Sequence, residues 1–340
     1  MPTPPPEGEQ TILDTSPEPR RGPLMIIGGA EDKLRRRTVL TEFVRAAGGD
    51  RAKIAVIATA SALGPEVVEV YDALFRKLGA AEVVSARPES REHAHDPAYI
   101  DLLADVTGIF MTGGNQLKLS GVICGTPFGD AIRAANDRGA VVAGTSAGAS
   151  IQSSHMVAFG VGGATPKQRM TQVAAGLGLL DSSVVDQHFE QRNRYGRLLM
   201  IVAQSPQLLG LGVDEDTAAV VTFDGEQQTL DVIGRGAVTI FDPAQVVTNA
   251  HEVPRSRPLL ASGVVLHVLP AGARFDLVAR VLVPQNSIAE AEAASIAAAG
   301  RDLHKLARDI AAADASPSVL RRRLARSRPS TKTRQTGEDA

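Results

Sequence analysis

The 340-residue chain has no tryptophan, only three tyrosines and a single cysteine, Cys124. One cysteine excludes an internal disulfide and a zinc site built from cysteines. It fits a reducing compartment, so we expect a cytoplasmic protein. There is no run of 18 apolar residues to cross a bilayer, and the start, MPTPPPEGEQ, has neither the basic nor the apolar region of a signal peptide. The formal net charge of −2 favours neither nucleic acid nor a membrane surface as a partner.

The two ends differ in composition from the middle. Six of the 20 prolines fall in the first 21 residues, so we predict that residues 1–22 are disordered. Ser287 and Glu290 have the spacing of a capping box, which predicts an alanine-rich helix near 288–312. Residues 301–340 hold 10 basic and 5 acidic residues, as in a solvated tail. We therefore divide the chain into a segment 1–22, a folded domain 23–285, in which any active site would lie, and a helix with a basic, disordered tail 286–340.

The folded domain alternates apolar and amphipathic segments. Short apolar runs that end in Gly, Thr or Ser occupy 24–29, 53–60, 82–86, 108–114 and 140–146, with amphipathic stretches at 33–48, 66–79 and 126–139. This alternation predicts an α/β fold with a doubly wound, mostly parallel sheet. After residue 210 the pattern becomes β-rich, which predicts hairpins added to the sheet's edge. In such a sheet ligands bind at the carboxyl ends of the strands, where the glycines after residues 27, 112 and 143 would gather.

One of these strand ends carries a candidate nucleophile. Gly144-Thr145-Ser146-Ala147-Gly148 is a G-x-S-x-G sequence between an apolar strand and a predicted helix. The same residues could simply form a tight turn, but glycines on both sides would also expose the Ser146 hydroxyl. The amide of Ala147, at a helix N-terminus, would stabilise an oxyanion. Gly113 or Gly114 would supply the second donor.

A serine nucleophile needs a base. The chain has seven histidines: His93, His95, His155, His188, His251, His267 and His304. We expect His93 and His95 to face solvent, with a metal pair as the alternative. We expect His155 to lie on the helix after Ser146, His267 to be in the core and His304 to belong to the tail helix. His188 ends the apolar run of LLDSSVVDQHF, as at the carboxyl end of a strand. It is therefore predicted to share a rim with Ser146.

The sequence patterns leave several candidates for the residue that orients the imidazole. The candidates are Asp186, Glu190, Asp214, Glu215 and Asp216. The last three follow the apolar run LGLGV, which would bring one of them to the rim. The chain order is then serine, histidine, acid, whereas an α/β-hydrolase has the order serine, acid, histidine.

A cationic cluster follows the candidate base. Arg192, Arg194 and Arg197 lie within six residues, near a predicted helix start where positive charge opposes the helix dipole. They could be a solvated face, but this position favours binding of anionic substrate groups. Asp186, Gln187, Asn115 and Gln116 could orient a substrate that carries both charges.

Four motifs in order resemble the cyanophycinase branch of a serine-peptidase family that also contains aspartyl dipeptidase. They are FMTGGNQLKL, GTPFGDAIRAANDRGAVVAGTSAGAS, GLGLLDSSVVDQHFEQRNRYGRL and LLGLGVDEDTA. The resemblance covers most of residues 23–285. It implies a flavodoxin-like sheet related to class I glutamine amidotransferases, usually in a homodimer, and no cofactor or metal. A glutamine amidotransferase itself would need a cysteine where Ser146 stands.

The resemblance also implies an activity and a set of residues. The activity is exopeptidase hydrolysis of cyanophycin, a polyaspartate with arginine on each β-carboxyl, to β-Asp-Arg dipeptides through an acyl-enzyme. By position, Ser146 matches the nucleophile, His188 the base and Glu215 the third triad member. The substrate pocket would contain Gln116, Asp186, Gln187, Arg192, Arg194 and Arg197. An aspartyl dipeptidase and a peptide-binding relative without activity are the alternatives.

Overall fold

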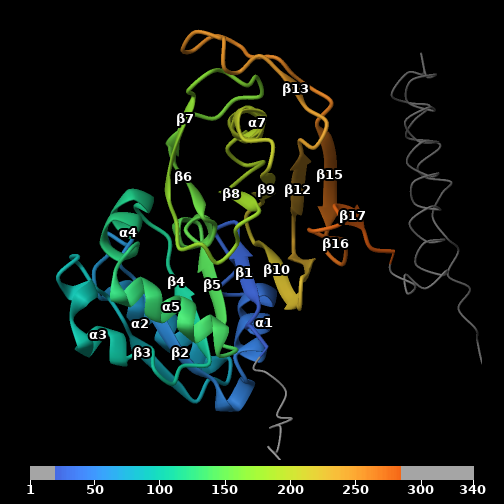
Figure 1. Cartoon of the computed structure of the whole chain (residues 1–340). Coiled ribbons are helices and arrows are strands. Elements are labelled where there is room, and N and C mark those ends of the chain that lie inside the picture. Colours follow the sequence, from blue (N-terminus) through green and yellow to red (C-terminus); the bar gives the residue numbers. More distant parts are fainter. Residues whose placement is uncertain (1–19, 285–340) are drawn as a thin grey trace, which may run out of the picture. The chain divides into compact units, whose positions relative to one another are not determined.

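The computed structural model describes residues 20–284, and its centre is a nine-stranded sheet (Figure 1). Five adjacent strands run parallel, in the order β1 (Leu24–Ile27), β5 (Val141–Thr145), β4 (Gly108–Met111), β2 (Lys53–Ile57) and β3 (Glu82–Ser85). They are the five apolar runs of the sequence. Each is short because the chain leaves the sheet at the Gly, Thr or Ser that follows. The predicted α/β sheet is confirmed.

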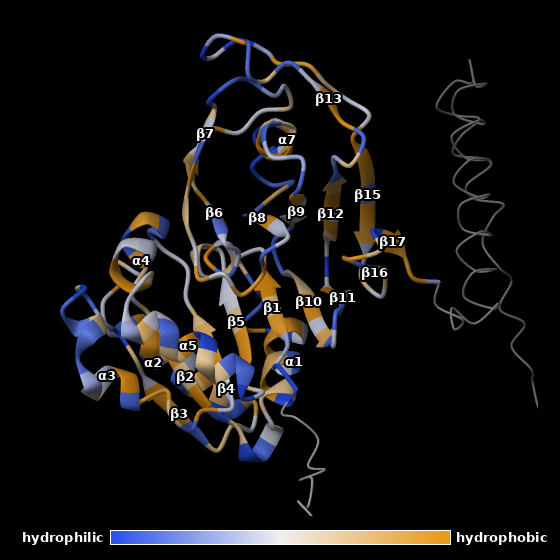
Figure 2. Cartoon of the chain, in the orientation of Figure 1, coloured by the Kyte–Doolittle hydropathy of each residue, from blue (hydrophilic) through white to orange (hydrophobic). Residues whose placement is uncertain are grey.

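Helices cover both faces of this parallel part. Alternate strand residues point to opposite sides, so Met25 and Ile27 face α1 (Thr38–Ala46) and α2 (Glu66–Lys77). Leu24 and Ile26 join the core that contains α4 (Gln116–Ile123) and α5 (Pro127–Asp137). Figure 2 shows these strands as mostly hydrophobic and the helices as mixed, in keeping with one buried side each. The parallel strands are therefore covered on both faces, as their continuous apolar runs require.

The antiparallel part of the sheet begins beside β1. Here the sheet continues through β10 (Thr217–Asp224), β11 (Gln227–Gly234), β16 (Arg274–Asp276) and β17 (Val281–Leu282), each antiparallel to its neighbour. These are the edge hairpins that the sequence predicts. They make the nine-stranded sheet mixed, with its parallel strands on one side.

Not all β-rich segments join this sheet. A second sheet has the order β15 (Val265–Pro270), β12 (Ala237–Asp242), β9 (Leu209–Val213) and β8 (Ser183–Gln187). Its strands β8 and β9 are parallel, and α7 (Tyr195–Gln204) connects them and packs on β9. The strand that ends at His188 thus lies outside the parallel sheet. The sequence pattern places all the β-rich segments after residue 210 at one edge of the parallel sheet. The four-stranded second sheet differs from that prediction.

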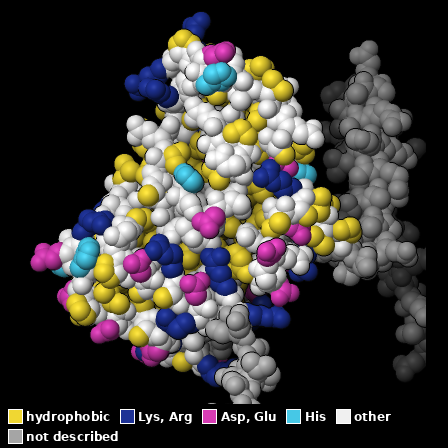
Figure 3. All heavy atoms as spheres, viewed as in Figure 1, with side chains coloured by type: hydrophobic (Ala, Val, Ile, Leu, Met, Phe, Trp, Pro, Cys, Tyr) yellow, Lys and Arg dark blue, Asp and Glu magenta, His cyan; other side chains and the backbone are white. Residues whose placement is uncertain are grey.

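Smaller elements complete the described part. They are η1 (Gly49–Arg51), η2 (His93–His95), α3 (Pro97–Asp101), α6 (Ala147–Ser150), the hairpin β6 (His155–Gly160) with β7 (Thr171–Ala175), and β13 (Val247–Thr248) with β14 (Ala261–Ser262). No helix within residues 20–284 is long and apolar enough to cross a membrane. On the face shown in Figure 3, acidic and basic side chains intermingle over the lower half.

Two histidines lie elsewhere than expected. The prediction that His155 shares a helix with Ser146 is wrong, because α6 ends at Ser150 and His155 begins β6. The Ser153 hydroxyl donates a hydrogen bond to the Ser150 carbonyl oxygen, in place of the backbone amide that would bond to it if the helix continued. His267 is not in the core. It is half-buried on β15, a strand with a mostly exposed surface, with its ring against Phe275.

The structure describes only a few residues at the two ends of the chain. Residues 1–19 and 285–340, which include the predicted capping box, the helix 288–312, His304 and the basic tail, are not among the described residues. Arg21 and Gly22, assigned from the sequence to the segment 1–22, are hydrogen-bonded to Asn136 of α5. The described fold therefore begins before residue 23.

Candidate active site

Ser146 lies on a sharp turn between β5 and α6. Its backbone has φ 54° and ψ −106°, which a residue with a side chain rarely adopts. The turn is held because the Ser146 amide donates to the Ile27 carbonyl oxygen of β1 at 3.0 Å. A side chain at Gly144 would come within 2.0 Å of the Gly148 carbonyl oxygen, so glycine is required for the close approach. This geometry is that of a nucleophile elbow.

His188 follows β8 and points its ring at Ser146. Its Nε2 lies 3.0 Å from the Ser146 Oγ, and its Nδ1 lies 2.6 Å from Oε1 of Glu215. The His188 amide donates to the Gly28 carbonyl oxygen after β1, which ties the second sheet to the first. The ring packs on Gly29, where a Cβ would lie 2.3 Å from the imidazole Cε1. The structure thus brings the serine, histidine and glutamate together in one hydrogen-bonded line.

The other candidate acids have different partners. Asp214 accepts from the amides of Glu190 and Ala237, and Asp216 accepts from the amide of Asp32. The Glu190 side chain is exposed. Glu215 is one residue from both aspartates. Its own amide donates to Gln191, which fixes the loop that presents it.

Burial has the largest effect on the pKa of His188 and lowers it. The hydrogen bond that the imidazole donates to the Glu215 carboxylate raises the pKa, while the positive charge of Arg192 lowers it further. The net pKa is below the usual value of histidine. The imidazole is therefore neutral at pH 7, with a free nitrogen lone pair to accept a proton.

Backbone amides beside Ser146 are free to bind an oxyanion. Within residues 20–284, no group accepts a hydrogen bond from the amides of Gly113, Gly114 or Ala147. A Cβ on Gly113 would lie 3.3 Å from the Ser146 Cβ, so this loop runs directly past the nucleophile. Ala147 is the first residue of α6. Free amides in this position are what an oxyanion hole requires.

The arginine cluster divides into buried and exposed members. Arg194 and Arg197 both contact Asp186, which has no exposed surface, and Arg197 does so with two nitrogens. Arg197 also donates to the Gly160 carbonyl oxygen of β6. Burial lowers the pKa of Arg194 to about 10, so its guanidinium is still charged at pH 7. These side chains join β6, β8 and α7 around one buried charge group.

The remaining predicted pocket residues are spread over the site. Gln187 is 2% exposed and accepts from the Ser150 hydroxyl, whereas the Gln116 amide donates to the Val157 carbonyl oxygen of β6. Arg192 is exposed and has no ion-pair partner in the described part of the chain. Substrate contacts by these residues stay a prediction. Asp186, Gln187, Arg194 and Arg197 are buried, so they would have to become exposed to contact a substrate.

Sequence reasoning missed a buried network next to the nucleophile. The carboxylate of Glu31 accepts from Lys33 at 2.6 Å and from the hydroxyls of Tyr71 and Thr145, each at 2.5 Å. Burial acts to raise the pKa of Glu31, but the charge of Lys33 and these donors hold it below its usual value. Thr145 directly precedes Ser146. The signal for this network is the charged sequence AEDK, which follows the glycines at the end of β1.

A pocket of about 470 Å³ opens at Ser146, and we call it the serine pocket. Its apolar side is Leu63, Val67 and Val70, and its polar side includes Lys33, Glu66 and Tyr71. Because the Lys33 side chain is one-third exposed, its ammonium can reach a ligand in the pocket. Within residues 20–284, no three histidine, cysteine or acidic side chains lie close enough to hold a metal ion.

Comparison with known proteins assigns this arrangement to a family. The model of peptidase family S51 matches residues 24–230. The chain belongs to peptidase family S51. This S51 protein is therefore a hydrolase of the serine-peptidase type. The resemblance inferred from the four motifs is confirmed.

Relatives of this S51 peptidase include named cyanophycinases. It is 40% identical to the cyanophycinase of Trichormus variabilis over 271 residues, which cover 79% of this chain and 90% of the relative. It is 39% identical to the cyanophycinase of Geminocystis herdmanii, over 75% of this chain and 94% of that one. The crystal structure of a peptidase from an acI-B1 Actinobacterium has a TM-score of 0.51 at 22% identity, covering 74% of this chain and 98% of that one. The last match supports the fold alone.

Proposed function

We propose that this S51 peptidase is an exopeptidase that hydrolyses cyanophycin to β-Asp-Arg dipeptides. The observation that carries the proposal is the line of hydrogen bonds from Ser146 through His188 to Glu215, on a strained turn beside free amides. The substrate is proposed from the 40% identity to cyanophycinases over most of the chain. A homodimer and a cytoplasmic location stay predictions.

The proposed reaction begins at the backbone carbonyl of an aspartyl residue in the polymer. His188 takes the proton of the Ser146 hydroxyl as its Oγ attacks, and Glu215 stabilises the imidazolium that forms. The amides of Ala147 and of Gly113 or Gly114 bind the oxyanion. His188 then gives its proton to the leaving amine. Water, activated by the same imidazole, hydrolyses the acyl-enzyme and frees the serine.

We propose that exposed cations bind the carboxylates of the substrate. Lys33, in the serine pocket, and Arg192, beside His188, carry positive charge at an accessible surface. We assign Asp186, Arg194 and Arg197 the role of positioning His188. Their buried ion pairs fix the end of β8 from which His188 projects. The amides of Gln116 and Gln187 keep α4, β6 and α6 in place around the serine pocket.

Incubation of the purified protein with cyanophycin tests the proposal. We expect mass spectrometry to detect β-Asp-Arg as the main product, and none with the variant S146A. Release from Asp-Leu, but not from the polymer, would instead favour an aspartyl dipeptidase. Binding of the polymer with no product from either substrate would favour a relative without activity.

A further inference from the structure

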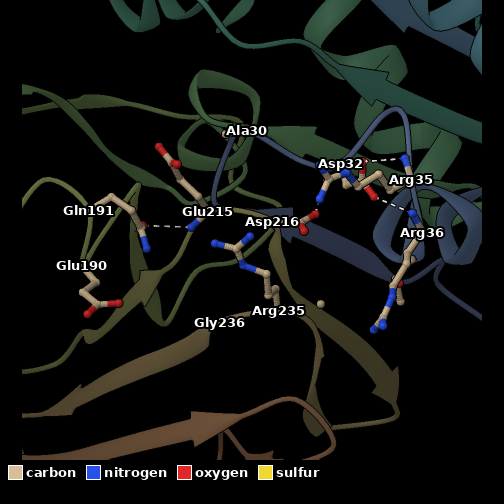
Figure 4. Close-up of a pocket in the computed structure, with 12 residues that line it drawn as sticks. Ala30, Asp32, Arg35, Arg36, Glu190, Gln191, Glu215, Asp216, Arg235 and Gly236 are labelled. Atoms are coloured by element: carbon tan, nitrogen blue, oxygen red, sulfur yellow. Dashed lines mark hydrogen bonds between the residues drawn. The ribbon is translucent and has the colours of Figure 1, made fainter.

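A second pocket lies on the other side of the catalytic glutamate. It has a volume of about 830 Å³, and its lining includes Glu215, three arginines (Arg35, Arg36 and Arg235) and Glu190. We call it the arginine pocket. In Figure 4, Arg235 lies between the segment of Glu190 and Gln191 and the segment that carries Arg35 and Arg36. The reaction described above uses only Glu215 of this lining.

The four outer charges of the arginine pocket have no partner in the described part of the chain. Arg35, Arg36, Arg235 and Glu190 are exposed, and none of their side chains forms an ion pair within residues 20–284. The other acids of the lining are already engaged. Asp32 accepts from four successive amides, Leu34 to Arg37, which lower its pKa, and Asp216 accepts from the Asp32 amide. Three cations and one anion thus remain for a ligand.

The walls of the pocket are held in place by the backbone. The Asp32 bonds close the loop that presents Arg35 and Arg36. The Arg235 amide donates to the Asp216 carbonyl oxygen at 2.9 Å. Gly234 has φ 110°, and a Cβ there would lie 2.3 Å from that same oxygen. The three arginines therefore project from a scaffold that needs little ordering on binding, which favours affinity.

The arginine pocket and the serine pocket meet at one residue. Ala30 is exposed, with φ 48°, and it lines both. A chain that is bound with its reacting unit at Ser146 can therefore pass Ala30 and place a second unit in the arginine pocket. A ligand of one unit would fill only the serine pocket.

We propose that the arginine pocket is a second subsite, which binds the arginine of a neighbouring unit of the polymer. This inference rests on the proposed function. Each unit of cyanophycin carries a free arginine carboxylate and a guanidinium. The carboxylate suits Arg35, Arg36 and Arg235, because their planar guanidinium groups can bind it with two parallel hydrogen bonds. Glu190 accepts the guanidinium of the same residue. The subsite favours the polymer over single units.

Kinetics with two substrates test the subsite. One is cyanophycin, and the other is β-Asp-Arg with a p-nitroanilide on its reacting carboxyl, which has a single unit. We expect the double variant R35E/R235E to lower kcat/KM for the polymer about tenfold relative to kcat/KM for the anilide, since each contact to a charged group is lost. The matched control is R51E. Arg51 is exposed in η1, at the amino-terminal edge of the sheet, and its charge reversal equals that of each single substitution, R35E or R235E.

The outcomes separate the subsite from the activity. If the wild-type protein hydrolyses neither substrate, the proposed function fails. If it hydrolyses both and R35E/R235E has the same ratio of kcat/KM values as R51E, the subsite is refuted while the activity stands. A second readout is binding to S146A: R35E/R235E in that background should bind a four-unit fragment about tenfold more weakly than S146A alone. Equal binding would also refute the subsite.

Discussion

The two halves of the triad come from two sheets that are built differently. Ser146 follows β5, and its turn depends on the close approach of Gly144 and Gly148 and on the bond from the Ser146 amide to Ile27 of the adjacent strand β1. His188 and Glu215 follow the parallel strands β8 and β9 of the second sheet. Their positions depend on contacts that are distant in sequence, such as the bond from the His188 amide to Gly28. The nucleophile is thus placed by contacts within one sheet, and the base and acid are placed by the packing of one sheet on the other.

The difference shows which substitutions should impair the site without removing a reacting atom. The second sheet depends on the buried group of Asp186, Arg194 and Arg197 and on the contact of His188 with Gly29. Neither the Asp186 group nor Gly29 contributes an atom to the proposed chemistry. Damage to the first should lower stability, and damage to the second should lower the rate.

The largest effect is expected for the nucleophile itself. S146A removes the attacking oxygen and should lower kcat by about 10⁶-fold, since members of a triad act as a unit. Because the alanine leaves both sheets intact, binding of cyanophycin and the free energy of unfolding should stay close to those of the wild type. Steady-state kinetics and calorimetry check these expectations. A variant with measurable turnover would contradict the role of Ser146.

The next effect tests the buried charge of the second sheet. D186N leaves two guanidinium groups buried without their anion, which should lower the free energy of unfolding by about 3–5 kcal/mol. Denaturant unfolding measures this loss. The control is D231N, which breaks the exposed ion pair with Arg274 and should cost less than about 1 kcal/mol. Equal losses would show that the Asp186 group does not hold the second sheet.

The contact between the two sheets is tested at Gly29. In G29A the new methyl group would overlap the His188 ring and displace it, so kcat should fall about 100-fold. The control G49A also places alanine at positive φ, but its Cβ would have no neighbour within 4 Å. Both variants should lose about 1 kcal/mol or more of stability from the backbone alone. Only G29A should lose activity, and unchanged activity would show that the ring position is not set by this contact.

The smallest effect concerns the pH profile. Arg192 contributes to the lowered pKa of His188, so R192Q should raise that pKa. The base is active when neutral, and the acidic limb of kcat/KM should therefore move to higher pH than in the wild type. Arg51, at the other edge of the sheet, serves as the control through R51Q, which should leave the limb in place. A shift to lower pH in R192Q would refute the assignment.

Local patterns predict the first half of the site well. The G-x-S-x-G run and the glycines at residues 28, 113 and 114 follow apolar strands, and parallel strands bring their ends together whatever the details of packing. The apolar runs also predict the strand ends at His188 and at Asp214–Asp216. The sequence could not assign these strands to a second sheet, because strand pairing is decided by tertiary contacts.

Side-chain partners in the second half were beyond sequence reasoning. Without the resemblance, Asp214, Glu215 and Asp216 are equivalent. Only the partners of their carboxylates separate them: backbone amides for Asp214 and Asp216, and the His188 ring for Glu215. Arg194 and Arg197 look like a surface for anions, yet they point inward at Asp186, eight and eleven residues away. Such pairs form because a buried charge needs a partner, and the sequence does not show which charges are buried.

The central claim is that Ser146 attacks the substrate with His188 as its base. Labelling with a serine-directed phosphonate, followed by mass spectrometry of the peptides, tests it most directly. We predict one adduct per chain, on Ser146, with none on S146A and much slower labelling of H188A. An adduct on another serine, or equal labelling of the wild type and H188A, would contradict the account.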